Sequence, residues 1–176
     1  ALFGNVTVST GAAPKFTDVS DSQWYYSDVC YAVQKGLVNG RSTTIYAPEE
    51  NLSVAEAIKL AACMHQLYLN GSVTLANDSS TWYKTYLDYA TTNGIVTKTY
   101  SNYDANITRG EYVSLFYAAL PESEYAQLNT VSDNKIPDVK LTDSNAKQIY
   151  AFYRAGILTG SDSIGTFSPN SNIKRS

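Results

Sequence analysis

The chain repeats one short phrase three times, and this repetition limits what it can fold into. A glycine ends a helix-like stretch and precedes two branched apolar residues at Gly36, Gly94 and Gly156. The first interval is 58 residues and the second is 62. Repeats of this length arise when one supersecondary unit is copied and packed against its neighbours. The pattern favours a modular binding surface over a single catalytic centre.

Each copy predicts a short helix, an extended stretch and a longer helix. In the third copy, 136–139 is an extended opening segment, Asp143 is a plausible helix N-cap, and Gly156 ends the short helix. In the first copy, the long helix is expected to begin at Ser53, directly after Leu52 opens a short polar motif.

The long helix of the second copy is expected over 108–120, where Pro121 stops it. The long helices of the first two copies are apolar nearly all round, so they should be buried, most simply against each other. We therefore predict a mainly α fold of three pseudo-repeated helix–loop–helix units around a central helix bundle. The third unit lacks its last helix.

The predicted organisation is one compact domain with four parts. They are a flexible leader at 1–15, a first repeat at 16–70, a second at 75–121 and a truncated third at 133–176.

Composition excludes several classes of function. The chain is 44% hydrophobic and 16% charged, so it is globular, and its formal charge of −3 disfavours nucleic acid as a partner. No apolar run is long enough for a membrane span, and no charged-then-apolar leader opens the chain, so we expect that any signal peptide has been removed. Cys30 and Cys63 fall on two predicted helices, as buried small hydrophobes or as a single bridge.

The start of each long helix carries the motif most able to bind a ligand. It reads L-S-V-A-E at 52–56, I-T-R-G-E at 107–111 and I-K-R-S at 173–176. Capping boxes explain two pairs, Ser53 with Glu56 and Thr108 with Glu111.

Capping does not explain Arg109 or Arg175. An arginine in a first turn is unfavourable with the helix dipole. Beside free backbone N–H groups, however, its guanidinium can receive a carboxylate or phosphate.

These motifs, in this order and spacing, resemble the S-layer homology (SLH) domain, which occurs as tandem triplets in bacterial cell-surface proteins. The resemblance rests on F-T-D-V, G-L-V-N-G, Y-A-P, I-P-D-V, G-I-L-T-G and G-T-F-S-P together with the helix-start motifs, and it covers roughly 16–176. It implies a secreted, three-pronged spindle that anchors proteins to the cell wall or S-layer. The implied ligand is a secondary wall polysaccharide with ketal-linked pyruvate or, in some lineages, modified peptidoglycan.

Carried over by position, the resemblance implies a set of ligand-binding residues around Arg109. The set comprises Arg109, Thr108, Gly110, Trp24, Trp82, Arg175 and Asp138. Glu111, with Ser53 and Glu56, is expected to act in helix capping. Gly110 would let a ligand approach the backbone, while Asp138, like Asp18, should fix a loop through backbone amides. A tryptophan would stack on a sugar or pack under its lobe.

Three positions depart from the family pattern. Val54 replaces the motif arginine in the first copy, Ser144 replaces the tryptophan of the third, and Lys174 is a poor N-cap. These changes predict one competent groove, centred on Arg109, instead of three equal ones.

Other classes of function remain as alternatives. A degenerate SLH module could serve protein interaction or assembly, as a homo-oligomer or with another S-layer chain that supplies the missing helix. An enzyme is disfavoured, because His65 is the single histidine and Cys63 cannot face it at i and i+2. No sequence motif calls for a metal or other cofactor.

Overall fold

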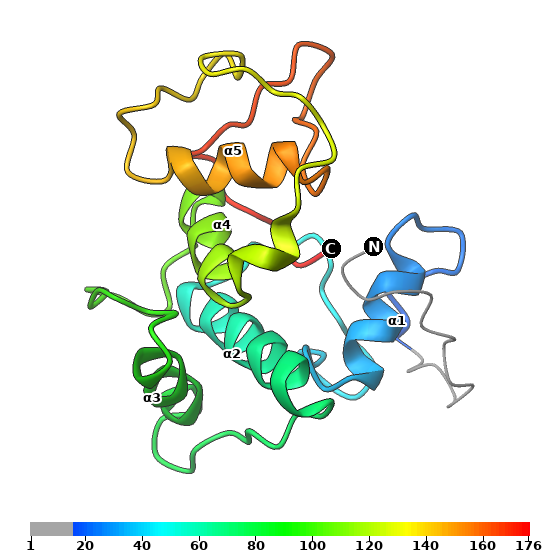
Figure 1. The fold of residues 1–176 in the computed structure, drawn as a ribbon. Coiled ribbons are helices and arrows are strands. Elements are labelled where there is room, and N and C mark those ends of the chain that lie inside the picture. The colour runs from blue at the N-terminus through cyan, green and yellow to red at the C-terminus, as the bar shows by residue number, and fades with distance from the viewer. Residues whose placement is uncertain (1–15) are drawn as a thin grey trace.

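The computed structural model describes residues 16–176, and the predicted leader at 1–15 lies outside the described residues. The helices are α1 (Tyr26–Gln34), α2 (Val54–Asn70), α3 (Lys84–Thr92), α4 (Arg109–Ala118), the 3₁₀ helix η1 (Glu122–Tyr125) and α5 (Ala146–Arg154). Between residues 16 and 176 there is no β-strand, only isolated bridges. The prediction of a mainly α fold is confirmed (Figure 1).

The two long helices begin where the sequence predicts, but their caps differ. At α2, Ser53 accepts from the Glu56 amide and Glu56 accepts from the Ser53 amide, which completes a capping box. At α4, Thr108 accepts from the Glu111 amide, as predicted, and its hydroxyl also donates to the Glu111 carboxylate. Lys98 binds the other oxygen of Glu111.

The short helices end as predicted and begin differently. Gly36, Gly94 and Gly156 follow α1, α3 and α5 with φ between 70° and 72°, a left-handed conformation that glycine adopts without strain. The predicted N-cap role of Asp143 is wrong. Its carboxylate turns back to accept from the Lys140 amide, and Asn145 is the N-cap, without a side-chain cap bond.

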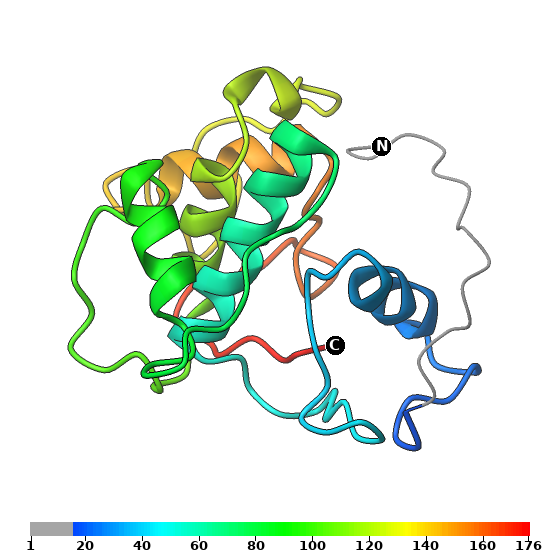
Figure 2. The same ribbon diagram turned by 90° about the horizontal axis from the view of Figure 1, so that it is seen from below.

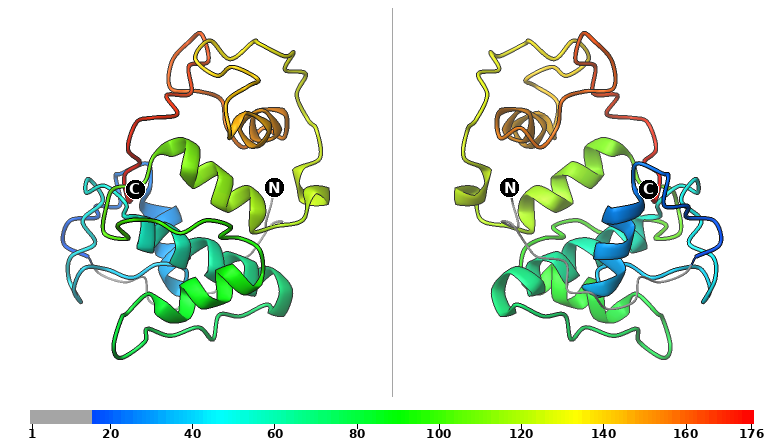
Figure 3. Two further views of the ribbon diagram at one scale, coloured as in Figure 1. Left: turned by 90° about the vertical axis from the view of Figure 1, so that its left-hand side faces the viewer. Right: turned by 90° about the vertical axis from the view of Figure 1, so that its right-hand side faces the viewer.

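Helix α2 runs through the main hydrophobic core. It contacts α3 on one side and α4 on another, and α4 in turn contacts α5 (Figures 1 and 3). Ala57, Ala61 and Ala62 of α2 are fully buried, and such small side chains let neighbouring helices approach closely. The predicted contact between the two long helices is confirmed.

Helix α1 belongs to a second, smaller core. Val29 of α1 packs there with Val19, Tyr25 and Tyr46, apart from the main core. Seen from below, α1 stands to one side of the other helices (Figure 2). Cys30 of α1 and Cys63 of α2 are both buried and unbridged, which agrees with the first of the two sequence readings.

Backbone bridges join the three segments that carry the helix-start motifs. They pair Asn51 with Lys174, Ser53 with Asn106, and Thr108 with Asn172, all antiparallel. Through this ring of bridges, the end of the described chain lies beside the starts of α2 and α4. The described helices include none long and apolar enough to cross a membrane.

Candidate functional site

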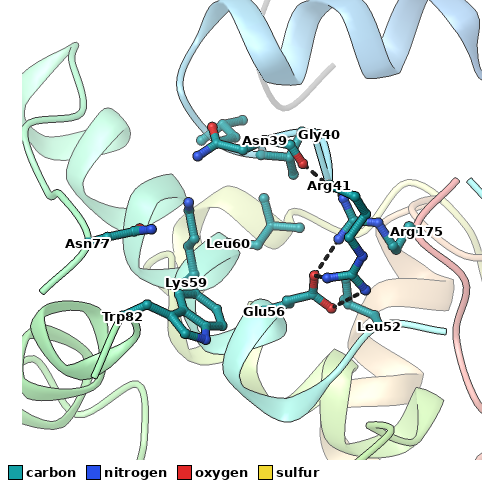
Figure 4. Close-up of a pocket in the computed structure, with 12 residues that line it drawn as sticks. Asn39, Gly40, Arg41, Leu52, Glu56, Lys59, Leu60, Asn77, Trp82 and Arg175 are labelled. Carbon is teal, nitrogen blue, oxygen red and sulfur yellow. Dashed lines mark hydrogen bonds and ion pairs between the residues drawn. The ribbon is translucent and has the colours of Figure 1, made fainter. Parts of the chain in front are cut away.

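A cavity of about 230 Å³ opens between the loop after α1, the first half of α2 and the segment before α3 (Figure 4). We call it the Trp82 pocket. Its lining consists of Leu37, Val38, Asn39, Gly40, Arg41, Leu52, Glu56, Lys59, Leu60, Asn77, Trp82 and Arg175. The cavity thus combines residues from all three repeat regions of the sequence.

The carboxylate of Glu56 lies at one end of this pocket between two arginines. Arg41 donates to Glu56 Oε1 at 2.6 Å, and Arg175 donates to the same oxygen (Figure 4). Only 13% of the Glu56 side chain and 6% of that of Arg175 are exposed, so this ion pair is weakly screened by solvent, whereas Arg41 is 42% exposed. The sequence assigned Glu56 to capping alone, whereas the structure shows that it also pairs with both guanidinium groups.

Arg175 has all three guanidinium nitrogens engaged with the protein. Besides its pair with Glu56, its Nε donates to the Tyr46 carbonyl at 3.1 Å and its Nη2 to the Asn39 carbonyl at 2.9 Å. The guanidinium also lies 4.9 Å from the centroid of the Tyr46 ring. With 6% of its side chain exposed, Arg175 fastens the end of the chain to the first repeat.

Lys59 lies at the other end of the pocket and is 9% exposed. Its ammonium lies 5.1 Å from the centroid of the Tyr86 ring. When the Asn39 amide is oriented to suit both of its neighbours, the ammonium donates to Asn39 Oδ1 at 3.1 Å. Burial lowers the pKa of Lys59 from its ordinary 10.5.

Sequence reasoning missed Lys59, although a signal was present. After Glu56, Lys59 is the only Asp, Glu, Lys or Arg residue of α2, in a stretch that is otherwise mostly apolar. Charged side chains are rarely fully buried unless they are paired, so a lysine in such a stretch merits attention as a possible ligand contact.

The two tryptophans at equivalent repeat positions differ in their surroundings. Trp82 is half-buried, lies edge-on to Tyr83 with ring centroids 5.5 Å apart, and lines the pocket. Trp24 is 76% exposed and lies edge-on to Tyr25. Trp24 therefore neither packs under its lobe nor reaches the Trp82 pocket.

Arg109 occupies a setting like that of Arg175, in another part of the fold. Its Nε donates to the Phe167 carbonyl at 2.9 Å, and its guanidinium lies 4.9 Å from the centroid of the Phe167 ring. Asp138 binds the amides of Phe167 and Ser168 at 2.8 and 2.6 Å, so it orders the loop that receives Arg109. Asp18 binds the Tyr46 and Ala47 amides in the same way.

The residues next to Arg109 are engaged in folding contacts. Thr108 caps α4. A Cβ on Gly110 would lie 2.0 Å from Asn145 Nδ2 and 3.3 Å from the Pro169 carbonyl oxygen. The absence of a side chain at Gly110 thus permits close packing against the segment before α5. Arg109, Thr108, Gly110 and Asp138 are not among the residues that line the Trp82 pocket.

A second cavity of about 420 Å³ lies at corresponding positions of the second repeat. We call it the Lys98 cavity, and its lining includes Lys98, Tyr100, Glu111, Ser114 and Ser144. Lys98 donates to Glu111 at 2.6 Å and lies 4.6 Å from the centroid of the Tyr100 ring. The lysine and the glutamate neutralise each other.

Glu111 shows the effect of this pairing on its ionisation. Burial alone would raise its pKa, but the hydrogen bond and charge of Lys98, with bonds from Thr108, hold it below the ordinary 4.5. The carboxylate therefore stays ionised and paired at neutral pH.

In the part of the chain that the structure describes, the remaining titratable groups form no recognisable catalytic arrangement. The ring nitrogen Nδ1 of His65 shares a hydrogen bond with the Tyr89 hydroxyl at 2.8 Å. In residues 16–176, no group of three or more His, Cys, Asp or Glu side chains could hold a metal ion.

Comparison with known proteins agrees with the motif-based resemblance. Residues 15–58 match the model of the S-layer homology domain. The chain is similar to the "Surface-layer 125 kDa protein" of Lysinibacillus sphaericus, with 34% identity over 110 residues, which is 57% of this chain and 9% of that protein. It is also similar to "S-layer protein sap" of Bacillus anthracis, with 24% identity over 91% of this chain and 20% of that protein.

A third relative is the "S-layer protein" of Bacillus thuringiensis subsp. finitimus, 23% identical over 89% of this chain and 20% of that protein. The chain thus spans a fifth or less of the length of these three relatives. The matches confirm the resemblance to the S-layer homology domain and a location at the bacterial cell surface.

Proposed function

We propose that this chain anchors a surface protein non-covalently to the bacterial cell wall, and that the Trp82 pocket binds an anionic secondary wall polysaccharide. One observation carries the proposal. Three cationic side chains, Arg41, Lys59 and Arg175, line this pocket. They face two carboxylates, Glu56 in the lining and Glu50 paired with Arg41, although the whole chain has a formal charge of −3. A local excess of positive charge on an acidic protein selects an anionic ligand.

The pocket also offers what a sugar ring requires. Trp82 is half-buried at its edge, and an indole presents a large apolar face together with one N–H donor. Asn39 and Asn77 add amide groups that suit hydroxyls. A sugar with a ketal-linked pyruvate has both a carboxylate and a ring, so it fits the cations and the indole together.

The test is co-sedimentation with purified bacterial wall sacculi, before and after mild acid removes acid-labile sugar decorations. We expect the protein to pellet with intact sacculi and to stay in solution with stripped ones. If it pellets with neither and forms dimers in solution, the proposal is wrong and a protein-interaction module takes its place. Equal pelleting with both preparations would favour modified peptidoglycan as the ligand.

Arg109 remains a predicted ligand residue, and the same assay tests it. Within residues 16–176, its guanidinium donates through Nε alone, to the Phe167 carbonyl, whereas all three nitrogens of Arg175 are engaged. If Arg109→Ala loses binding while a Trp82 variant keeps it, the ligand binds at Arg109. If only the Trp82 variant loses binding, the ligand binds in the Trp82 pocket.

A further inference from the structure

The cations of the Trp82 pocket differ in how many hydrogen-bond donors remain free to bind a ligand. Arg175 uses its Nε, Nη1 and Nη2 to donate to Tyr46, Glu56 and Asn39, and its side chain is 6% exposed. Arg41 makes ion pairs with both Glu50 and Glu56. Both arginines are therefore already compensated by carboxylates of the protein.

Lys59 makes no ion pair. No Asp or Glu of the described chain lies within ion-pair distance of its ammonium, whose neighbours are the Tyr86 ring and the Asn39 amide oxygen. The Glu56 carboxylate acts on the pKa of Lys59 only from a greater distance, and burial outweighs it. A buried ammonium without a counter-charge is costly to the fold. An anion that enters the pocket would supply the opposite charge and so offset this cost.

Asn77 provides a second donor at the same end of the pocket. Its Oδ1 accepts a hydrogen bond from the Tyr86 hydroxyl at 3.0 Å, so the orientation of its amide is fixed. The amide nitrogen is thereby directed toward the Lys59 ammonium, with the Trp82 ring below them (Figure 4). Two converging donors beside an indole suit a carboxylate attached to a sugar ring.

We infer that Lys59 and Asn77 hold the anionic group of the wall ligand next to Trp82, while Arg175 and Glu56 act as a clasp that positions the pocket wall. The inference rests on the proposed wall-binding function and names the residues that carry it. It assigns the anion contact to Lys59, a residue outside the helix-start motif.

The Lys98 cavity supports this assignment by contrast. Ser114 stands where the Trp82 pocket has Lys59, and the lysine that is present, Lys98, is paired with Glu111. The Lys98 cavity therefore has no uncompensated cation. Its lysine provides a matched control, since a change there removes a positive charge without touching the Trp82 pocket.

The experiment compares Lys59→Met and Lys98→Met in the sacculus assay, at several salt concentrations. Methionine has about the same length and a good helix propensity, so α2 should be kept. We expect Lys59→Met to bind intact sacculi at least about tenfold more weakly, with a shallower salt dependence, because a charged contact is lost. Lys98→Met should bind like the parent.

Unfolding in urea separates lost binding from lost folding. Because Lys59→Met removes a buried charge that has no ion-pair partner, its midpoint should equal or exceed that of the parent. If Lys59→Met binds like the parent, the inference is wrong and the proposed function stands. If the parent itself does not bind sacculi, both are wrong.

An Arg175→Lys variant tests the clasp. It keeps the charge but cannot reproduce the three-way hydrogen bonding of the guanidinium. We expect lower stability together with a wall affinity that, for the folded fraction, stays closer to the parent than that of Lys59→Met. The reverse order of affinities would overturn the assignment of the anion to Lys59.

Discussion

The Trp82 pocket and the Lys98 cavity occupy corresponding positions in successive repeats, yet they differ in charge and in aromatic content. The first has three cations against two carboxylates, Glu56 in its lining and Glu50 paired with Arg41, and the second has one neutralised pair. The exchanged residues are Lys59 for Ser114, Trp82 for Ser144 and Gly40 for Lys98. The comparison teaches that a few side chains on a repeated backbone determine which copy can hold an anion.

The largest expected effect comes from placing a side chain at Gly40, where the second repeat carries Lys98. A Cβ there would lie 2.5 Å from the Ser42 carbonyl oxygen and 2.7 Å from that of Ile45. Backbone atoms cannot move away cheaply, so Gly40→Ala should lower the free energy of unfolding by about 3 kcal/mol. Urea unfolding measures this loss.

Gly71→Ala is the control for backbone strain. Gly71 has a φ of +72° but no heavy atom within 4 Å of the added Cβ. It should therefore cost only about 1 kcal/mol, from the left-handed conformation alone. Equal losses of unfolding free energy at Gly40 and Gly71 would show that crowding by backbone atoms does not determine the cost of a side chain at Gly40.

Trp82→Ser copies the residue of the Lys98 cavity into the Trp82 pocket. Buried aromatic contacts dominate many binding sites, and their removal costs about 2 kcal/mol, or roughly 30-fold in affinity. We expect a loss of this size in sacculus binding, with Trp24→Ser as the matched control because Trp24 is 76% exposed and outside the pocket. A greater loss of sacculus binding in Trp24→Ser would show that the sugar contacts Trp24 instead of Trp82.

The smallest effect concerns the pH dependence of the Lys98–Glu111 pair. The pKa of Glu111 is lowered in the folded protein, so the pair contributes stability above the ordinary value of 4.5, and this stability is lost as pH falls through the lowered pKa. Because the pair is partly exposed, the contribution should be under about 1 kcal/mol.

Urea unfolding of Lys98→Met at pH 7 and pH 3 tests this contribution. The parent should lose slightly more stability than the variant between these two values. An identical loss in both proteins would mean that the ion pair does not stabilise the fold.

Local signals in the sequence predicted much of the fold. Ser53 and Thr108 marked the starts of the long helices, and Gly36 marked the end of a short one, since capping chemistry depends on neighbouring residues. The prediction of Asp143 as a helix N-cap was wrong because an aspartate can accept a hydrogen bond from a turn amide as readily as from a helix amide.

The candidate site was harder to predict, because its residues meet only in the folded chain. Arg175 was identified from its motif, but its bonds to Asn39 and Tyr46 join positions far apart in sequence. Lys59 was hidden in an apolar helix, and its environment depends on Asn77 and Tyr86 of the next repeat. Distant contacts of this kind cannot be read from periodicity or spacing.

The ring of backbone bridges has a consequence for how the protein folds. Its contacts are extremely non-local, and the hydrogen bond from the Tyr46 hydroxyl to the Arg175 carbonyl spans 129 positions. Closing such loops costs chain entropy before any contact can compensate for it, which slows folding. During synthesis, the Trp82 pocket therefore cannot be completed by α1 and α2 alone. It is complete only after the residues near Arg175 have been made and have packed against them. We expect the pocket to form late and cooperatively, after the helices themselves.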